Sequence, residues 1–130
     1  MRYLGIDYGA RRIGLALSDE KGEFAFPNTT VPNDGSTVDR IGNMCTKDGV
    51  QEIVMGDTRA GNEGENAITK EAEDFAELLS KHTGLIVHRV REAWSSVEAS
   101  RFAPKGKEHD DAAAAAIILQ RFLDGHQTRG

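Results

Sequence analysis

The sequence predicts a single α/β domain over residues 1–130, in which a mixed sheet of five strands is covered by helices on both faces. Three observations lead to this prediction. The length of 130 residues fits one domain of ordinary size. The N-terminal part contains short apolar segments separated by turns, which is typical of an antiparallel meander. From Ser36 onward, helical and strand-like patterns alternate, as in parallel βα units.

Three strands are expected in the N-terminal part of the chain. The first covers Tyr3 to Tyr8 and the second covers Arg12 to Ser18. The turn from Asp19 to Gly22 leads to a third strand over about Glu23 to Val31. Pro27 interrupts this third strand and has no backbone N–H. We therefore expect the strand to end early or to lie at an edge of the sheet.

Helices and strands alternate in the rest of the chain. Ser36 is a suitable N-cap for the first helix, and Gly49 and Gly84 can each end a helix. The expected elements are a helix from Ser36 to about Asp48, a strand from Gln51 to Met55, a helix over about Ala67 to His82, a strand from Leu85 to Val90, a short helix from Ser95 or Ser96 to about Phe102, and a last helix over about Asp110 to Asp124.

Composition and charge narrow the class of protein. Apolar residues make up 38% and charged residues 28% of the chain, as in soluble globular proteins. No segment has the pattern of a signal peptide or a membrane span, and Cys45 as the single cysteine excludes an internal disulfide. We therefore expect a cytoplasmic protein with no membrane partner. The net charge of −5 counts against binding nucleic acid by bulk electrostatics, and it raises the question whether some acids bind metal.

Asp7 is the first candidate for such a role. It ends a strand that we expect to be central and mostly buried, where a carboxylate is costly unless it is paired or bound to a cation. Gly5 and Gly9 leave room for a ligand to approach the backbone. The alternative is that Asp7 only closes the turn after the first strand.

Asp111 is the second candidate. In the last helix it shares one stripe with Ala115, Ile118 and Phe122, and this apolar stripe must pack on the sheet. The neighbouring Asp110 lies closer to the side of the helix, where it suits a cap, although it could serve as an extra ligand. A capping role is the alternative for either aspartate.

Glu92 is the third candidate, because it follows the strand that ends at Val90. Alone it would be an ordinary exposed glutamate. It becomes a candidate site residue only because Asp7 and Asp111 are candidates as well. Carboxylates without histidine or thiolate suit Mg²⁺ or Mn²⁺, and such ions support phosphodiester hydrolysis. Nearby basic residues would then position phosphates, unless they are simply solvated surface charges. These residues are Arg11, Arg12, Arg101, Lys105 and Lys107.

Several segments resemble the YqgF family, also called RuvX or Holliday junction resolvase-like proteins. Residues Leu4 to Gly9 and Arg12 to Asp19 resemble the family's opening. Glu92 with Ser95 to Ala99 is similar to its Asp-Glu-Arg-x-Ser/Thr-Thr-x-x-Ala segment. The segment from Asp111 to Leu123 is similar to its closing helix. The resemblance covers nearly the whole chain, with the segments in the family's order.

This resemblance implies an RNase H-like fold and a nuclease that depends on Mg²⁺ or Mn²⁺ and acts on structured nucleic acid. The family is usually assigned to trimming the 5′ end of pre-16S rRNA during ribosome biogenesis. An older assignment is Holliday junction resolution on branched DNA. Carried over to this sequence, the catalytic and metal-binding acids are Asp7, Glu92 and Asp111. We expect a monomer or a weak homodimer.

The sequence also departs from the family pattern. Where the family usually has Asp-Glu-Arg, this chain has Arg91-Glu92-Ala93, and the loop beginning Met55-Gly56-Asp57-Thr58 lacks the usual proline. These changes leave the three acids in place but affect the positioning of substrate. They favour, as an alternative, a nucleic-acid- or ribosome-binding module with weakened catalysis. A two-lobed ATPase of the actin or sugar-kinase type is set aside because one domain cannot form two lobes.

Overall fold

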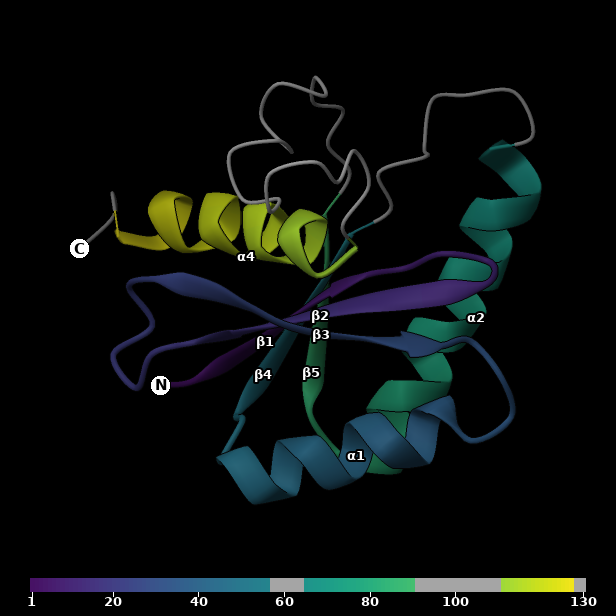
Figure 1. Ribbon diagram of the computed structural model, residues 1–130, viewed down its shortest axis with the longest axis horizontal. Helices are drawn as coiled ribbons and strands as arrows, with labels where there is room; N and C mark the ends of the chain where they lie inside the picture. The colour runs from purple at the N-terminus through teal and green to yellow at the C-terminus, as the bar shows by residue number, and fades with distance from the viewer. Residues whose placement is uncertain (57–64, 91–110, 128–130) are drawn as a thin grey trace.

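The computed structural model describes residues 1–56, 65–90 and 111–127 (Figure 1). Its elements in chain order are β1 (Tyr3–Asp7), β2 (Arg12–Ser18), β3 (Ala25–Pro32), α1 (Thr37–Asp48), β4 (Glu52–Gly56), α2 (Glu65–Thr83), β5 (Ile86–Val90) and α4 (Asp111–Gln127). The predicted bounds of these elements differ from the observed ones by a few residues at most. The short helix predicted over residues 95–102 lies outside the described residues.

The strands form one mixed sheet with the order β3-β2-β1-β4-β5. β2 runs antiparallel to both of its neighbours, β1 and β3, whereas β4 runs parallel to β1 and β5 runs parallel to β4. This arrangement confirms the predicted α/β class, with an antiparallel meander followed by βα units. β1 is the middle strand of the sheet. Its carboxyl end therefore lies at the centre of the row that the strand ends form, away from the two edge strands.

Of the two outcomes expected for the third strand, an early end or a place at the edge of the sheet, the structure shows the second. β3 lies at the edge, but it does not break at Pro27 and continues to Pro32. The register shifts between Leu15 and Ala16, so that Thr29 pairs with Leu15 while Pro27 pairs with Ala16. This irregularity places one extra residue in β3 and lets an edge strand accommodate a proline.

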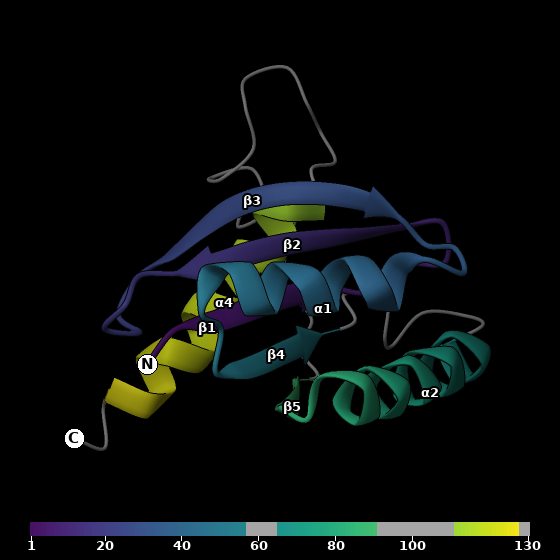
Figure 2. The same ribbon diagram turned by 90° about the horizontal axis from the view of Figure 1, so that it is seen from below.

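Helices cover both faces of the sheet. α1 and α2 lie on one face and α4 lies on the other (Figures 1 and 2). The core on the α1 and α2 side contains Leu4, Ile6, Tyr8, Ile13, Leu15, Ile41, Cys45, Val50, Ile53, Met55, Ala72, Phe75, Ala76 and Leu79. The core on the α4 side contains Tyr3, Ala16, Ala25, Val54, Ala115, Ala116, Ile118, Leu119 and Leu123.

The first helix begins at the predicted position, but Ser36 does not cap it through its side chain. Ser36 occupies the N-cap position, but its side chain makes no capping hydrogen bond. Instead its hydroxyl donates to Asp34 Oδ1 at 2.7 Å, and its backbone N–H donates to the same oxygen at 2.9 Å. These bonds lower the pKa of Asp34. At the other end, Gly49 has a left-handed φ of 69° and ends α1 as predicted.

α4 packs so close to the sheet that a Cβ added to several of the strand glycines would overlap it. A Cβ on Gly5 would lie 2.7 Å from Leu119 Cβ and 2.9 Å from the carbonyl oxygen of Ala115. A Cβ on Gly56 would lie 2.8 Å from Ile118 Cδ1. The glycines in β1 and β4 therefore allow the helix to lie at this depth, with Leu119 packed on Gly5 and Ile118 packed on Gly56. Within the described residues, no helix combines the length and the apolar character that crossing a membrane requires.

Candidate active site

Asp7 is a buried carboxylate at the carboxyl end of the central strand. It is only 3% exposed, as the sequence predicts. Its alternation with Leu4 and Ile6, which face α1 and α2, places it on the α4 face of the sheet. Its partners in the register are Gly14 on β2 and Gly56 on β4. The carboxylate is therefore flanked on both sides by residues without side chains.

Asp111 is brought to the same place by the packing of α4. It is the first residue of that helix, and its carbonyl oxygen would lie 1.8 Å from a Cβ on Gly14. Gly14 is also the residue directly opposite Asp7, and paired Cα atoms in antiparallel strands are about 4.5–5.5 Å apart. The start of α4 thus lies about one strand spacing from Asp7. This confirms that the apolar stripe of the last helix faces the sheet and carries Asp111 with it.

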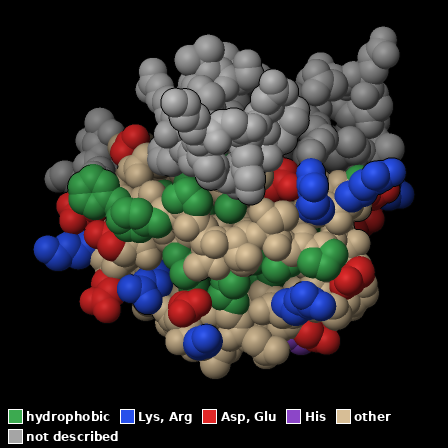
Figure 3. Space-filling view, in the orientation of Figure 1, with side chains coloured by type: hydrophobic (Ala, Val, Ile, Leu, Met, Phe, Trp, Pro, Cys, Tyr) green, Lys and Arg blue, Asp and Glu red, His purple; other side chains and the backbone are tan. Residues whose placement is uncertain are grey.

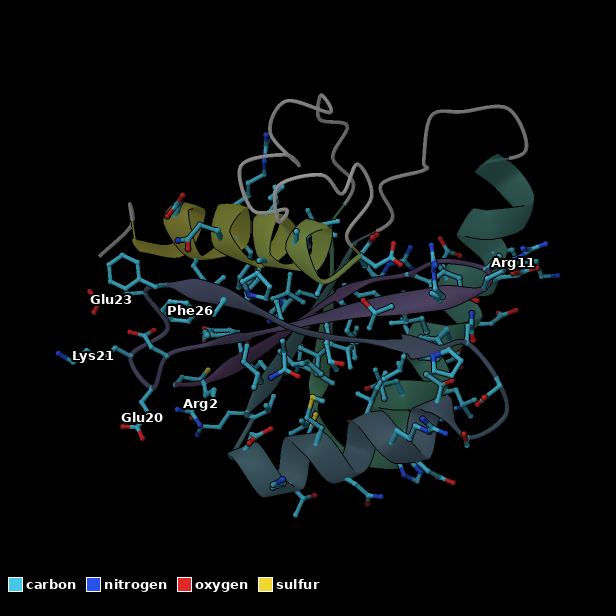
Figure 4. All side chains as sticks on the ribbon, viewed as in Figure 1. Arg2, Arg11, Glu20, Lys21, Glu23 and Phe26 are labelled. Carbon is cyan, nitrogen blue, oxygen red and sulfur yellow. The ribbon has the colours of Figure 1, made fainter. Side chains whose placement is uncertain are left out.

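The Asp111 side chain is largely enclosed and forms an ion pair with Arg12. It is 14% exposed, and its Oδ2 lies 3.1 Å from Arg12 Nε. Arg12 itself is 65% exposed, so most of its side chain faces solvent. Arg11, the other predicted phosphate-binding residue in this part, is exposed and points outward at the end of the sheet (Figure 4). The structure therefore joins Arg12 to an acid of the site, a pairing that the sequence does not reveal.

The turn that carries the two arginines is held by Asn33. Its backbone N–H donates to the carbonyl oxygen of Arg11 at 2.8 Å. Its side-chain Nδ2 donates to the carbonyl oxygen of Gly9, also at 2.8 Å. Asn33 was not among the predicted site residues, and no sequence motif marks it. Its role depends on β3 ending beside the turn between β1 and β2, which only the sheet topology decides.

Glu92 lies outside the described residues, as do Arg101, Lys105, Lys107 and Asp110. The strand before Glu92 nevertheless ends level with Asp7 in the register of the sheet. Val90, the last residue of β5, pairs with Gly56, which in turn pairs with Asp7. Two strand spacings separate Val90 from Asp7, about 10 Å in all. The chain therefore leaves β5 at the end of the sheet where Asp7 and the start of α4 lie, two residues before Glu92.

The donor set suits a hard divalent cation. Asp7 and Asp111 supply carboxylate oxygens, which Mg²⁺ and Mn²⁺ prefer. No group of three or more histidine, cysteine or acidic side chains gathers within the described ranges, so a third protein ligand would come from the remainder of the chain. The two histidines with described side chains have acidic partners elsewhere: His88 Nε2 lies 2.6 Å from Glu52 Oε1, and His82 Nε2 lies 3.4 Å from Asp39 Oδ1.

The described surface has no broad basic area on the face that Figure 3 shows. Acidic and basic side chains are interspersed there (Figure 3). Glu20, Lys21 and Glu23, for example, lie together at the end of the sheet away from Arg11 (Figure 4). This pattern agrees with the net charge of −5. The described part of this face therefore offers no general positive field for a polyanion.

Comparison with known proteins identifies the family. The model of the RuvX family, described as Holliday junction resolvase, matches residues 1–125. This chain belongs to the RuvX family. A relative from Leifsonia xyli subsp. xyli is 40% identical over 133 residues, with 95% of this chain and 86% of the relative covered. A relative from Chlorobium luteolum is 37% identical, with 95% and 94% covered. Both are provisionally named pre-16S rRNA nuclease.

Solved structures show the same fold at low sequence identity. RuvC from T. thermophilus, in complex with a Holliday junction substrate, has a TM-score of 0.69 at 13% identity, with 98% of this chain and 96% of RuvC covered. The fowlpox virus resolvase, in complex with Holliday junction DNA, has a TM-score of 0.60 at 11% identity, with 97% and 99% covered. The RNase H-like fold predicted for this RuvX protein is therefore confirmed.

Proposed function

We propose that this RuvX protein hydrolyses phosphodiester bonds near the 5′ end of pre-16S rRNA and that Asp7, Glu92 and Asp111 hold the divalent cation it requires. Membership of the RuvX family makes the chain a nuclease. The proposal concerns its substrate, its metal and its catalytic residues. The observation that carries it is the burial of Asp7 between two glycines, with the first residue of α4 packed on one of them.

The two described acids are suited to hold a cation because rigid elements position both of them. Asp7 belongs to the central strand, and Asp111 is fixed by the contact between α4 and Gly14. When bound, Mg²⁺ or Mn²⁺ would activate the attacking water and stabilise charge on the leaving oxygen. The low exposure of both carboxylates strengthens their attraction for a cation, because little water screens it.

The basic residues would bind the substrate rather than take part in the chemistry. Arg11 and Arg12 leave the turn after β1, close to Asp7, and arginines bind phosphate oxygens through several N–H groups. Arg101, Lys105 and Lys107 precede Asp111 in the sequence and would extend the same contacts. We further propose a cytoplasmic location, where ribosomal RNA is assembled into subunits, and a monomer or weak homodimer.

Two observations support pre-16S rRNA as the substrate and Holliday junctions as the second candidate. The curated relatives at 33–40% identity that cover most of this chain are provisionally named for pre-16S rRNA. The family description names Holliday junctions instead. The two substrates share the phosphodiester chemistry, so the same acids would serve either one. A dimer would be needed to cut a junction symmetrically.

A cleavage assay with both substrates tests the proposal. The wild-type chain is incubated with Mn²⁺ and either a 5′ pre-16S rRNA fragment or a four-way DNA junction. Asp7→Asn keeps the shape of the side chain but removes its charge, and we expect the cleavage rate to fall at least about a hundredfold. Asp74→Asn, which changes an exposed aspartate of α2, is the matched control and should retain the wild-type rate.

Each outcome of this assay separates two possibilities. Equal rates for Asp7→Asn and the wild type would refute the catalytic role of Asp7. Cleavage of the junction without cleavage of the RNA would favour the second substrate. Binding of RNA without cleavage in any metal would indicate that the changes at Arg91-Glu92-Ala93 have left a binding module, and it would overturn the proposed activity.

A further inference from the structure

We propose that Arg12 competes with the divalent cation for Asp111 and that metal binding releases Arg12 toward a phosphate of the substrate. The inference rests on the proposed function, because it assumes that Asp111 is a metal ligand. It assigns to Arg12 a positioning role that simple phosphate binding does not require. The Arg12 Nε and Asp111 Oδ2 atoms lie 3.1 Å apart, so the guanidinium already neutralises the carboxylate.

The surroundings of Arg12 allow its side chain to move while its backbone stays in place. The backbone belongs to β2, and the preceding turn is held by the two hydrogen bonds from Asn33. The side chain is 65% exposed, whereas Asp111 is 14% exposed. The acid is thus held by α4, and the arginine is the partner that can turn away into solvent.

Electrostatic attraction favours an exchange in which Asp111 binds the metal ion instead of Arg12. An ion pair with one largely exposed member contributes little to stability, because water screens it and holding the long side chain costs entropy. A divalent cation carries twice the charge, and in the proposed site Asp7 as well as Asp111 would hold it. Once it binds, the positive guanidinium at Asp111 is repelled. A phosphate close to the metal then offers Arg12 a new anionic partner.

This arrangement would link the two binding events. While Arg12 pairs with Asp111, it is withdrawn from the substrate. When the metal takes its place, Arg12 becomes available to bind phosphate, so metal and substrate support each other's binding. Removing the arginine charge should therefore have opposite effects on the two ligands. The affinity for metal should rise, and the affinity for nucleic acid should fall.

Calorimetric titration with Mn²⁺ tests this inference without relying on activity. For Arg12→Gln we expect the dissociation constant for Mn²⁺ to fall about three- to tenfold, because one repelling charge is removed. Arg11→Gln makes the same change in net charge one residue away, and it should alter the Mn²⁺ affinity less than about twofold. Arg12→Lys keeps the charge and should restore the wild-type affinity. Thermal unfolding verifies that each variant is folded.

Steady-state kinetics with the pre-16S rRNA fragment provide the second readout. Arg12→Gln should raise the KM for RNA while lowering the Mn²⁺ concentration needed for half-maximal rate. An unchanged or weaker Mn²⁺ affinity in Arg12→Gln would overturn the competition and leave Arg12 as a structural partner of Asp111. If neither the wild type nor Arg12→Gln binds Mn²⁺, the proposed function itself fails, and this inference fails with it.

Discussion

Replacing Gly14 with alanine would test the geometry on which the site depends. The added Cβ would lie 1.8 Å from the carbonyl oxygen of Asp111, 2.1 Å from its carbonyl carbon and 2.8 Å from the backbone nitrogen of Ala112. Ordinary contacts begin at 3.4 Å, so about 1.6 Å of separation is missing. All three atoms belong to the backbone, so no rotation of a side chain can relieve the overlap. The start of α4 must move away from β2.

That movement should affect metal binding more than folding. We expect the free energy of unfolding to fall by about 1–3 kcal/mol, which is typical of overpacked interiors. Protein ligands to a metal must lie within about 0.2 Å of their proper distances, and Asp111 would be displaced by several times that amount. We therefore expect Mn²⁺ binding by calorimetry to be lost and the cleavage rate to fall by about a hundredfold or more.

Two further glycine variants provide the controls. A Cβ on Gly35 meets nothing within 4 Å, so Gly35→Ala should leave stability and Mn²⁺ affinity unchanged. Gly5→Ala overpacks the same helix further along, against Leu119, and should destabilise the fold while displacing Asp111 less. Wild-type Mn²⁺ affinity in a folded Gly14→Ala variant would refute the conclusion that the contact between Gly14 and α4 positions Asp111.

Two other predictions concern the fold. Gln120 accepts from the backbone N–H of Ala25 at 2.9 Å and donates to the carbonyl oxygen of Glu23 at 3.0 Å, so Gln120→Leu should cost about 1–3 kcal/mol in urea unfolding. A cost below about 0.5 kcal/mol would show that these bonds do not hold α4 to β3. Burial, and secondarily Asp48, raises the pKa of the Cys45 thiol to about 11 from an ordinary 9.0. The folded state therefore holds this proton more tightly, and its contribution to stability is full below pH 9 and is lost as the pH rises toward 11. Stability measured across that range should fall less steeply in Cys45→Ala, and equal slopes would contradict the shift.

Local patterns were sufficient to predict most of the fold. Apolar alternation located the strands, and Gly49 ended α1 where a left-handed residue was expected. Pro27 was a harder case, because a missing N–H predicts either an end or an edge. The structure shows that a place at the edge of the sheet is sufficient to accommodate Pro27. The strand continues past it because the register shifts next to Ala16. Ser36 failed as a capping side chain because Asp34, two residues earlier, accepts its hydroxyl instead.

Part of the site could also be predicted. Asp7 was recognisable because a charged residue ended a strand expected to be central, and Asp111 because it fell on an apolar helical stripe. Gly14 and Asn33 were missed, since a strand glycine and a loop asparagine have no distinctive local pattern. Their importance depends on contacts with α4 and with the turn after β1, which are far from them in sequence.

The sequence by itself determined the α/β class, the order of the elements and the acids expected to carry the chemistry, because these depend on periodicity and on the cost of burying charge. Tertiary structure alone decided which of these residues meet. It packed the backbone of Asp111 against Gly14, which is the residue opposite Asp7 in the sheet. It also paired the Asp111 side chain with Arg12. The physical reason is that the distance between the end of β1 and the start of α4 depends on how closely the helix packs on the sheet. This packing depth depends on the strand glycines on which α4 packs, and no local pattern shows that these glycines lie under the helix.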